Sequence, residues 1–343
     1  MSELLYLSDR PSESEIDGWH AVMAAAHAHD LPAVPGPGRV ETAGVLCVTD
    51  DDSRYVRLAV PAVPAVPEAS AVPGEGGAYA GVVSLRLFDD EGNRRTAWVE
   101  HLAVRPELRN RGIGTRLWQE VRAILEREQR TAVGVQVEIG GAGEKFALAH
   151  GFACAIPLVM YVQDVQDVLG ESAEASLPEG YRFVEWDGVV PDEFAAPFAA
   201  VRDAMSDSPW GDFEEERPSW DAARSRAFQQ LVVDRGGEML TVVAVAPDGS
   251  FAGYTELVRR SPDGARAVQY GTAVAAAHRG LGLGRAVKLR MLRLVGEGRM
   301  GEGRMPVREI VTGVSDDNGP MRAVNKLLGY RPERSVGVFQ ARL

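Results

Sequence analysis

The sequence predicts two tandem α/β domains, each an α+β fold built on a mixed sheet. The chain has 343 residues, which suits two domains of ordinary size. Strand-like and helix-like segments follow the same order in each half. A glycine-rich stretch stands between a strand and a helix in both halves: LRNRGIGTRLW in the first and HRGLGLGRAVK in the second. We therefore expect domains at residues 1–168 and 169–343, with a polar linker near residues 164–180.

The duplication is visible in the spacing of the two glycine-rich stretches. An offset of 170 residues relates several pairs of positions: Val104 and Val274, Arg109 and Arg279, Gly112 and Gly282, and Gly114 and Gly284. Near the end of each half the offset is 178, and the direct repeat GEGRMGEGRM accounts for part of the difference. A period this long indicates a duplicated domain rather than a solenoid.

The first half is expected to begin with a short strand and a helix that Ser12 or Ser14 caps. Apolar runs at residues 43–49 and 55–60 predict two strands. A tract rich in Pro, Ala and Val then extends over residues 59–77. Because proline has no N–H for a sheet ladder, we interpret this tract as a surface insertion.

Two neighbouring strands are expected next, in the segments AYAGVVSLRLFD and RTAWVEHLAV. They lead into the first glycine-rich stretch and a helix, whose apolar residues fall on one face: Leu117, Val121, Ile124 and Leu125. A strand and then a helix–turn–strand segment complete this half. The second half repeats the order from Tyr181 onward, with helical segments near residues 191–205 and 217–235.

The net charge of −12 argues against a nucleic-acid partner, because an acidic surface repels phosphate groups. The same charge would attract a cationic small molecule or peptide, or it serves solubility alone. No run reaches the ~18 apolar residues that span a membrane, and the acidic N-terminus is unlike a signal peptide. We therefore expect a cytoplasmic protein with no membrane partner. The sequence carries no indication of its oligomeric state.

The cysteines and histidines do not predict a metal site. Cys47 and Cys154 stand in apolar runs and are expected to be buried thiols. Neither lies near another Cys or His at metal-ligand spacing. His27 and His29 are expected at a helix end, without a third ligand beside them.

Each glycine-rich stretch has the arrangement of an anion site. A strand ends, several backbone N–H groups follow, and a helix begins, so the amides and the helix dipole point at one place. Glycine lets a phosphate approach without a Cβ in its path. The spacing R-x-x-G-x-G differs from the P-loop and from the dinucleotide fingerprint. The alternative is a glycine-rich turn without a ligand. Because the glycine-rich stretch occurs twice in matching positions, we favour a pyrophosphate site.

These residues carry a family resemblance. The segments LAVRPELRNRGIGTRLW and TAVAAAHRGLGLGRAVKL resemble the acetyl-CoA-binding signature of the GCN5-related N-acetyltransferase (GNAT) superfamily. NGPMRAVNKLLGY is similar to a later helix of that superfamily, and EKFALAHGF is its diverged counterpart in the first half. The resemblance implies two tandem GNAT acyl-CoA N-acyltransferase folds, similar in layout to mycothiol synthase-like bacterial acetyltransferases.

The resemblance implies that acetyl-CoA, as co-substrate, lies in a V-shaped gap between the fourth and fifth strands of a domain. In the second half it assigns the pyrophosphate to the backbone of Arg279, Gly280, Leu281, Gly282, Leu283 and Gly284. It places the pantetheine arm beside Ala273 and Val274, and it includes Asn318 in the later motif. The first-half counterparts are Ala103, Val104, Arg109, Arg111, Gly112, Ile113 and Gly114.

Acetyl transfer needs a neutral amine and a group that takes its proton. Glu256 is the candidate base of the second half, and an exposed strand carboxylate is the alternative interpretation. Glu100 is the candidate of the first half, because strand alternation places it on one face with Val104. Tyr270 occupies the equivalent position in the second half.

The superfamily's helix tyrosine, which protonates the CoA thiolate, is replaced by Asn325 in the second half and Ala147 in the first. The proton then comes from water or from another group such as Tyr270. Asp207 and Asp212 lie in the expected acceptor-side loop, where they either bind an acceptor cation or act as turn residues.

The leading interpretation is an acetyl-CoA-dependent N-acetyltransferase that acts on a primary amine of a small molecule or peptide by direct attack in a ternary complex. The alternatives are a CoA-binding interaction protein without turnover, and an acyltransferase for a longer acyl group. The second half keeps both the glycine loop and Asn318, so we expect it to be the active one. Antibiotic, amino-sugar, peptide and polyamine acceptors all fit.

Overall fold

The computed structural model describes residues 3–62, 79–169, 175–207, 214, 216, 219–300 and 305–343. Its contacts divide the chain into two compact units. The first unit comprises Met1–Ile156, Asp212–Glu216 and Gly337–Leu343, and the second comprises Pro157–Gly211 and Arg217–Val336. Within the described ranges, no helix is long and apolar enough to cross a bilayer.

The first unit has a mixed sheet with the strand order β1-β2-β3-β4-β5, followed by β12. Its own strands are β1 (Leu5–Tyr6), β2 (Ser53–Pro61), β3 (Tyr79–Phe88), β4 (Thr96–Val104), β5 (Ala132–Glu138) and the start of β6 (Ala153–Asp164). Its helices are α1 (Glu13–Asp30), α2 (Arg39–Cys47), α3 (Ile113–Arg127) and α4 (Ala142–Ala149). The pairs β1–β2, β2–β3 and β3–β4 are antiparallel, whereas β4 and β5 are parallel.

The second unit repeats this plan with the strand order β6-β11-β10-β9-β8-β7. Its strands are β7 (Arg182–Asp187), β8 (Glu238–Val245), β9 (Phe251–Arg259), β10 (Arg266–Val274), β11 (Glu309–Ser315) and the start of β12 (Arg331–Arg342). Its helices are α5 (Val165–Leu169), α6 (Asp192–Arg202), α7 (Ala222–Asp234), α8 (Leu283–Gly296) and α9 (Gly319–Leu327). Here β10 and β11 are the parallel pair.

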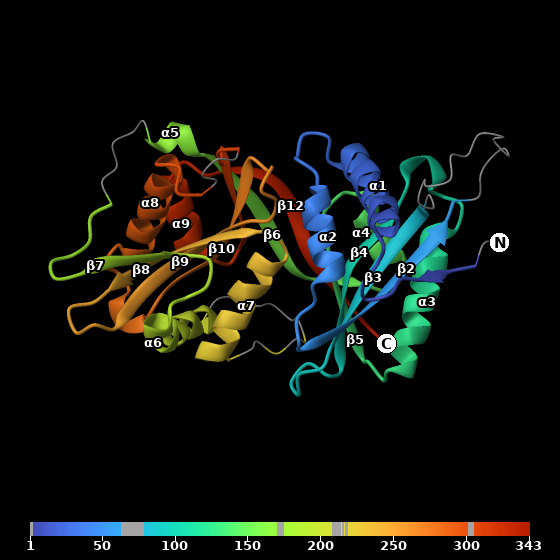
Figure 1. Ribbon diagram of the computed structural model, residues 1–343, viewed down its shortest axis with the longest axis horizontal. Coiled ribbons are helices and arrows are strands. Elements are labelled where there is room, and N and C mark those ends of the chain that lie inside the picture. The colour runs from blue at the N-terminus through green and yellow to red at the C-terminus, as the bar shows by residue number, and fades with distance from the viewer. Residues whose placement is uncertain are drawn as a thin grey trace. The chain divides into compact units, whose positions relative to one another are not determined.

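Helices cover both faces of each sheet (Figure 1). In the first unit Leu58 packs in the core that contains α3, whereas its neighbour Ala59 packs with α1 and α2. In the second unit Val242 packs with α8 and Val243 with α6. Successive strand residues point to opposite faces, so each sheet is buried on both sides between two helical layers.

Each unit is completed by residues from the other half of the sequence. β6 starts in the first unit and pairs with β11 of the second from Leu158 to Asp164. The last residues of β12 belong to the first unit, where Phe339 and Ala341 are buried in its core. The expected linker begins with a helix, α5, and the domain boundary near residue 168 stays a prediction.

Several local predictions can be compared with the structure. Ser12 caps α1 in a capping box with Glu15, as expected. The strand expected at residues 43–49 is wrong, because that run forms the end of α2, where Thr42 and Leu46 turn inward at helical spacing. The expectation of buried thiols is also wrong: Cys47 ends this helix and is exposed, and so is Cys154. The Pro/Ala/Val tract is strand as far as Pro61, and residues 63–78 lie outside the described part.

Candidate functional site

In both units the fourth and fifth strands separate after a few residues. β10 and β11 pair over three positions that end at Val268 and Val311, yet β10 continues to Val274. β4 and β5 pair over four positions that end at Val99 and Val135, and β4 also continues. Beyond these pairs the fourth and fifth strands no longer form a ladder, and we call this parting of the two strands the gap of each unit. The V-shaped gap that the family resemblance implies requires such a parting, and its role as the acetyl-CoA site stays a prediction.

A β-bulge interrupts the fourth strand beside each gap. In the second unit Tyr270 and Gly271 together oppose Glu256 on β9. In the first unit Glu100 is the extra residue between Val99 and His101. A bulge bends a strand and re-aims its side chains. The regular alternation of side chains between the two faces of β4 is therefore interrupted at Glu100. The expectation that Glu100 and Val104 share one face depended on that alternation.

The loop after each fourth strand has the same backbone conformation in both units. Gly112 and Gly282 are the N-caps of α3 and α8, with φ of 80° and 75°. Two residues earlier, Asn110 and Gly280 also have positive φ, 60° and 79°. The first helical hydrogen bond of α8 runs from Ala286 N to Gly282 O at 3.0 Å. The amides before it have no acceptor within the helix and can bind an anion.

The arginines that open the two loops bind the end of the preceding strand. Arg279 Nε donates to Val274 O, and Arg109 Nε donates to Val104 O, both at 3.2 Å. Arg109 also forms a bidentate pair with Asp30 at 2.6 and 2.7 Å. These side chains therefore fix the loop on its strand, a role that the sequence motif alone does not reveal.

The last glycine of each loop has different surroundings in the two units. A Cβ on Gly284 would meet only Val274 Cγ2, at an ordinary 3.7 Å. A Cβ on Gly114 would lie 3.3 Å from Phe146 Cε2 and also near the side chains of Val104 and Leu102. The loop of the second unit therefore leaves more room for a ligand or a larger side chain.

Glu256 is buried on the face of the sheet that α6 and α7 cover. Its exposure is only 1%. Its Oε2 accepts from Arg202 Nη2 at 3.1 Å, and its Oε1 accepts from Gln229 Nε2 at 3.0 Å. Burial raises the pKa of Glu256, while Arg202 and Gln229 oppose the shift. The interpretation of Glu256 as an exposed strand carboxylate is therefore wrong.

An aromatic cluster surrounds this ion pair. The Arg202 guanidinium lies 3.7 Å from the ring centroid of Trp220 and 4.8 Å from that of Phe228. The Tyr270 ring is 5.5 Å from Phe228, and Tyr270 is 45% exposed. The structure thus brings Tyr270 and Glu256 toward the same helix, α7. Sequence reasoning missed Arg202 because no short motif marks it.

The other predicted residues take varied positions. Asn318 caps α9, and its side chain accepts from Met321 N at 3.2 Å. Asp207 lies in a 3₁₀ segment after α6, and Asp212 lies outside the described residues. Glu100 is half-buried at the bulge of β4.

Asn325, at the expected place of the general acid, is fully buried, and its side-chain oxygen is already hydrogen-bonded within the protein. Its Oδ1 accepts from Lys288 Nζ at 2.7 Å. The ammonium of Lys288 also lies over the ring of Tyr330, 4.9 Å from the centroid. Burial lowers the pKa of Lys288 to about 7. Sequence reasoning missed Lys288, because a lysine on a helix usually faces solvent.

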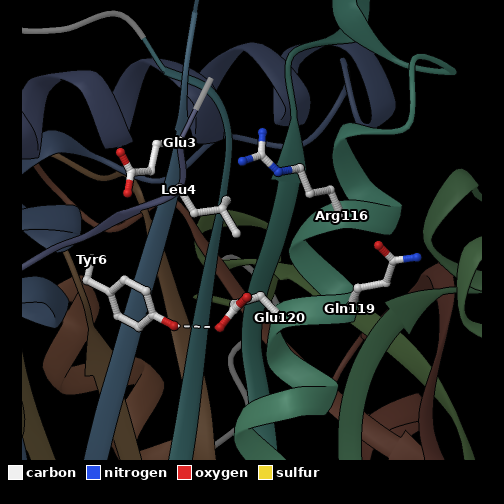
Figure 2. A pocket seen from close by; sticks show the side chains of 6 residues that line it. All are labelled: Glu3, Leu4, Tyr6, Arg116, Gln119 and Glu120. Carbon is white, nitrogen blue, oxygen red and sulfur yellow. Dashed lines mark hydrogen bonds between the residues drawn. The ribbon is translucent and has the colours of Figure 1, made fainter. Parts of the chain in front are cut away.

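A surface pocket of the first unit lies apart from these residues. Figure 2 shows the side chains that line it, which come from the N-terminal segment and α3: Glu3, Leu4, Tyr6, Arg116, Gln119 and Glu120. Tyr6 Oη donates to Glu120 Oε1 across it at 2.7 Å. None of the predicted site residues lines this pocket. In the part of the chain that the structure describes, no group of three His, Cys, Asp or Glu residues could hold a metal ion.

Comparisons with known proteins agree with this geometry. The model of the Acetyltransferase (GNAT) family matches residues 63–152. A tandem GNAT protein from the clavulanic acid biosynthesis pathway is similar with a TM-score of 0.80 and 26% identity, over 99% of this chain and 98% of that one. A GCN5-related N-acetyltransferase from Sphaerobacter thermophilus is similar with a TM-score of 0.67 and 15% identity, over 99% and 95% of the chains. No curated protein matches the chain.

Proposed function

Because this chain belongs to the GNAT family of acetyltransferases, we propose that its second unit transfers an acetyl group from acetyl-CoA to a primary amine of a small molecule or peptide. One observation carries the proposal: the gap beside β10 and a glycine loop with free space at Gly284 occur together in that unit. The amine and acetyl-CoA meet in a ternary complex, so binding both supplies much of the rate.

The backbone of the second unit offers two binding elements for the co-substrate. The amides at the start of α8, from residue 280 onward, would bind the pyrophosphate. Ala273 pairs on one side with Tyr254 of β9, which leaves the other edge of β10 to the gap. The amides of a pantetheine arm can bind that edge as a partner strand would. Arg279 keeps the loop and the strand end in fixed positions by donating to Val274 O.

The reaction forms a bond from the amine nitrogen to the acetyl carbon, and the carbon–sulfur bond breaks to release CoA. The amine must be neutral to attack, so its proton passes to a base or to water. Glu256 is the candidate base, and burial shifts its pKa in the direction that favours proton uptake. Tyr270, exposed at the bulge, lies on the same side and would contact the acceptor.

The first unit keeps the gap and the loop but has less space at the loop, since Phe146 lies close to Gly114. We infer that it binds acetyl-CoA more weakly and mainly supports the fold. A calorimetric titration of the whole protein should then give one strong site for acetyl-CoA.

Two measurements test the proposal. Titration with acetyl-CoA should show binding at micromolar concentration, and its absence would refute the function. Thiol release from acetyl-CoA is then followed with a panel of aminoglycosides, amino sugars, peptides and polyamines. Binding without release for every amine favours a non-catalytic CoA-binding protein, whereas faster release from longer acyl-CoA favours another acyl donor.

A further inference from the structure

The second unit contains a set of buried or half-buried polar side chains beside its gap that the first unit lacks. They are Thr255, Gln269, Thr272, Lys288, Asn325 and Tyr330. The residues at the equivalent places of the first unit are Val83, Val99, Leu102, Trp118, Ala147 and Phe152.

The structure supports this equivalence directly. Thr255 pairs with Thr272 across β9 and β10, as Val83 pairs with Leu102 across β3 and β4. Tyr330 N donates to Asn325 O at 3.0 Å, and the same bond joins the corresponding residues of the first unit at 3.1 Å.

The polar residues are not needed for the fold. A buried polar group must be hydrogen-bonded to avoid a desolvation cost, and its net contribution to stability is then modest. The first unit builds the same architecture with apolar residues at all six places. Their presence in one unit, next to the gap, therefore indicates a task that belongs to that gap.

The orientation of the Gln269 amide follows from its neighbours. Its Nε2 lies 3.2 Å from Glu256 O, which is a backbone carbonyl and can only accept. The nitrogen therefore faces β9, where it also donates to Thr255 Oγ1. The other end of the amide, Oε1, accepts from Tyr330 Oη at 3.2 Å.

This orientation bears on the direction of the neighbouring hydroxyls. Thr255 Oγ1 accepts from Gln269, and two acceptors lie near its own hydrogen: Thr272 Oγ1 at 2.7 Å and Gly271 O at 3.3 Å. The shorter contact favours Thr272 as the acceptor. The hydrogen of Thr272 is then left to point elsewhere. Thr272 stands on β10 past Val268, the last residue that pairs with β11, and it is partly exposed.

We propose that the Thr272 hydroxyl donates a hydrogen bond to the sulfur of bound acyl-CoA as the carbon–sulfur bond breaks, and that Gln269 is the positioning residue that aims it. The inference rests on the proposed function of this unit. The electron pair of the broken bond goes to sulfur, Thr272 keeps its proton, and the thiolate takes a proton from solvent. This donor replaces the missing helix tyrosine, since Asn325 at that place is bound to Lys288.

The test compares Thr272→Val, Gln269→Leu and the double variant in the full chain. Each single change should lower kcat about tenfold or more, because one hydrogen bond to the developing charge is lost. KM and the calorimetric Kd for acetyl-CoA should stay unchanged, which also shows that the unit is folded. Because both residues act through one hydroxyl, the double variant should lose no more than either single variant.

Thr272→Ser should restore most of the activity, since it restores the hydroxyl. Thr96→Val, which removes a buried hydroxyl bonded to Asn93 O in the first unit, is the matched control and should keep wild-type kcat. Wild-type kcat in Thr272→Val, or multiplied losses in the double variant, would overturn the inference while leaving the proposed function intact. A wild-type protein that binds acetyl-CoA but acetylates no amine would overturn both.

Discussion

Replacing Lys288 with Met is expected to stabilise the second unit at neutral pH. Lys288 is fully buried, its Nζ donates to Asn325 Oδ1, and burial lowers its pKa from 10.5 to about 7. The folded-state pKa is below the unfolded one, so the unfolded chain binds more protons between pH 7 and pH 10.5. Stability of the wild-type protein should therefore rise with pH across this window.

The magnitude follows from the shift in the pKa of Lys288. A pKa of about 7 in the folded state, against 10.5 in the unfolded chain, corresponds to about 5 kcal/mol, of which about 4 kcal/mol acts at pH 7 and about 2 kcal/mol at pH 9. The Met variant also leaves Asn325 Oδ1 without its donor, which costs about 2 kcal/mol. The variant should thus gain about 2 kcal/mol at pH 7 and close to nothing at pH 9.

Urea unfolding followed by tryptophan fluorescence at the two pH values measures this effect. The midpoint of the wild-type protein should move up between pH 7 and pH 9 by more than that of Lys288→Met. Lys326→Met is the matched control, because Lys326 is exposed on α9 and should leave the pH dependence unchanged. A Lys288→Met variant that is less stable than wild type at pH 7, or that keeps the full pH dependence, would refute the reasoning.

Three more predictions concern the site and the two units. Glu256→Gln keeps the size of the side chain but removes the candidate base and the charged partner of Arg202. The kcat for amine acetylation should therefore fall at least about tenfold. An unchanged kcat would exclude Glu256 as the base. Gly282→Ala, at φ 75°, should cost about 1 kcal/mol of stability in urea unfolding, and no loss would contradict the left-handed cap. A chain ending at residue 336 lacks the buried Phe339 and should lose about 3 kcal/mol or more from the first unit, whereas an unchanged first unfolding transition would contradict this placement.

The duplicated loops could be predicted from the sequence because their chemistry is local. The positive φ of Gly112 and Gly282 requires a residue without Cβ strain, so glycine spacing reports the backbone directly. The order of strands and helices followed from apolar patterns in the same way. The strand expected at residues 43–49 failed because an apolar run of that length does not distinguish a strand from a buried helix face.

The residues that bear on the candidate chemistry depend on contacts between distant segments. Arg202 and Glu256 lie on different elements, and nothing in either local sequence indicates that they pair. Lys288 and Asn325 meet only because α8 packs beside α9. The end of β6 belongs to the second unit, where it pairs with β11, and the end of β12 belongs to the first unit. The periodicity of apolar residues indicates a strand but does not indicate with which other strand it pairs.

The most direct test of the central claim is acetyl-CoA-dependent thiol release by Gly284→Glu and Gly114→Glu, each measured with the amine that the wild-type protein accepts. In the second unit a side chain at residue 284 has room in the folded loop but places a carboxylate where the pyrophosphate would bind. We expect Gly284→Glu to fold normally and lose activity, and Gly114→Glu to lose stability while its folded fraction stays active. Equal loss of activity in folded samples of both variants would contradict the assignment of catalysis to the second unit.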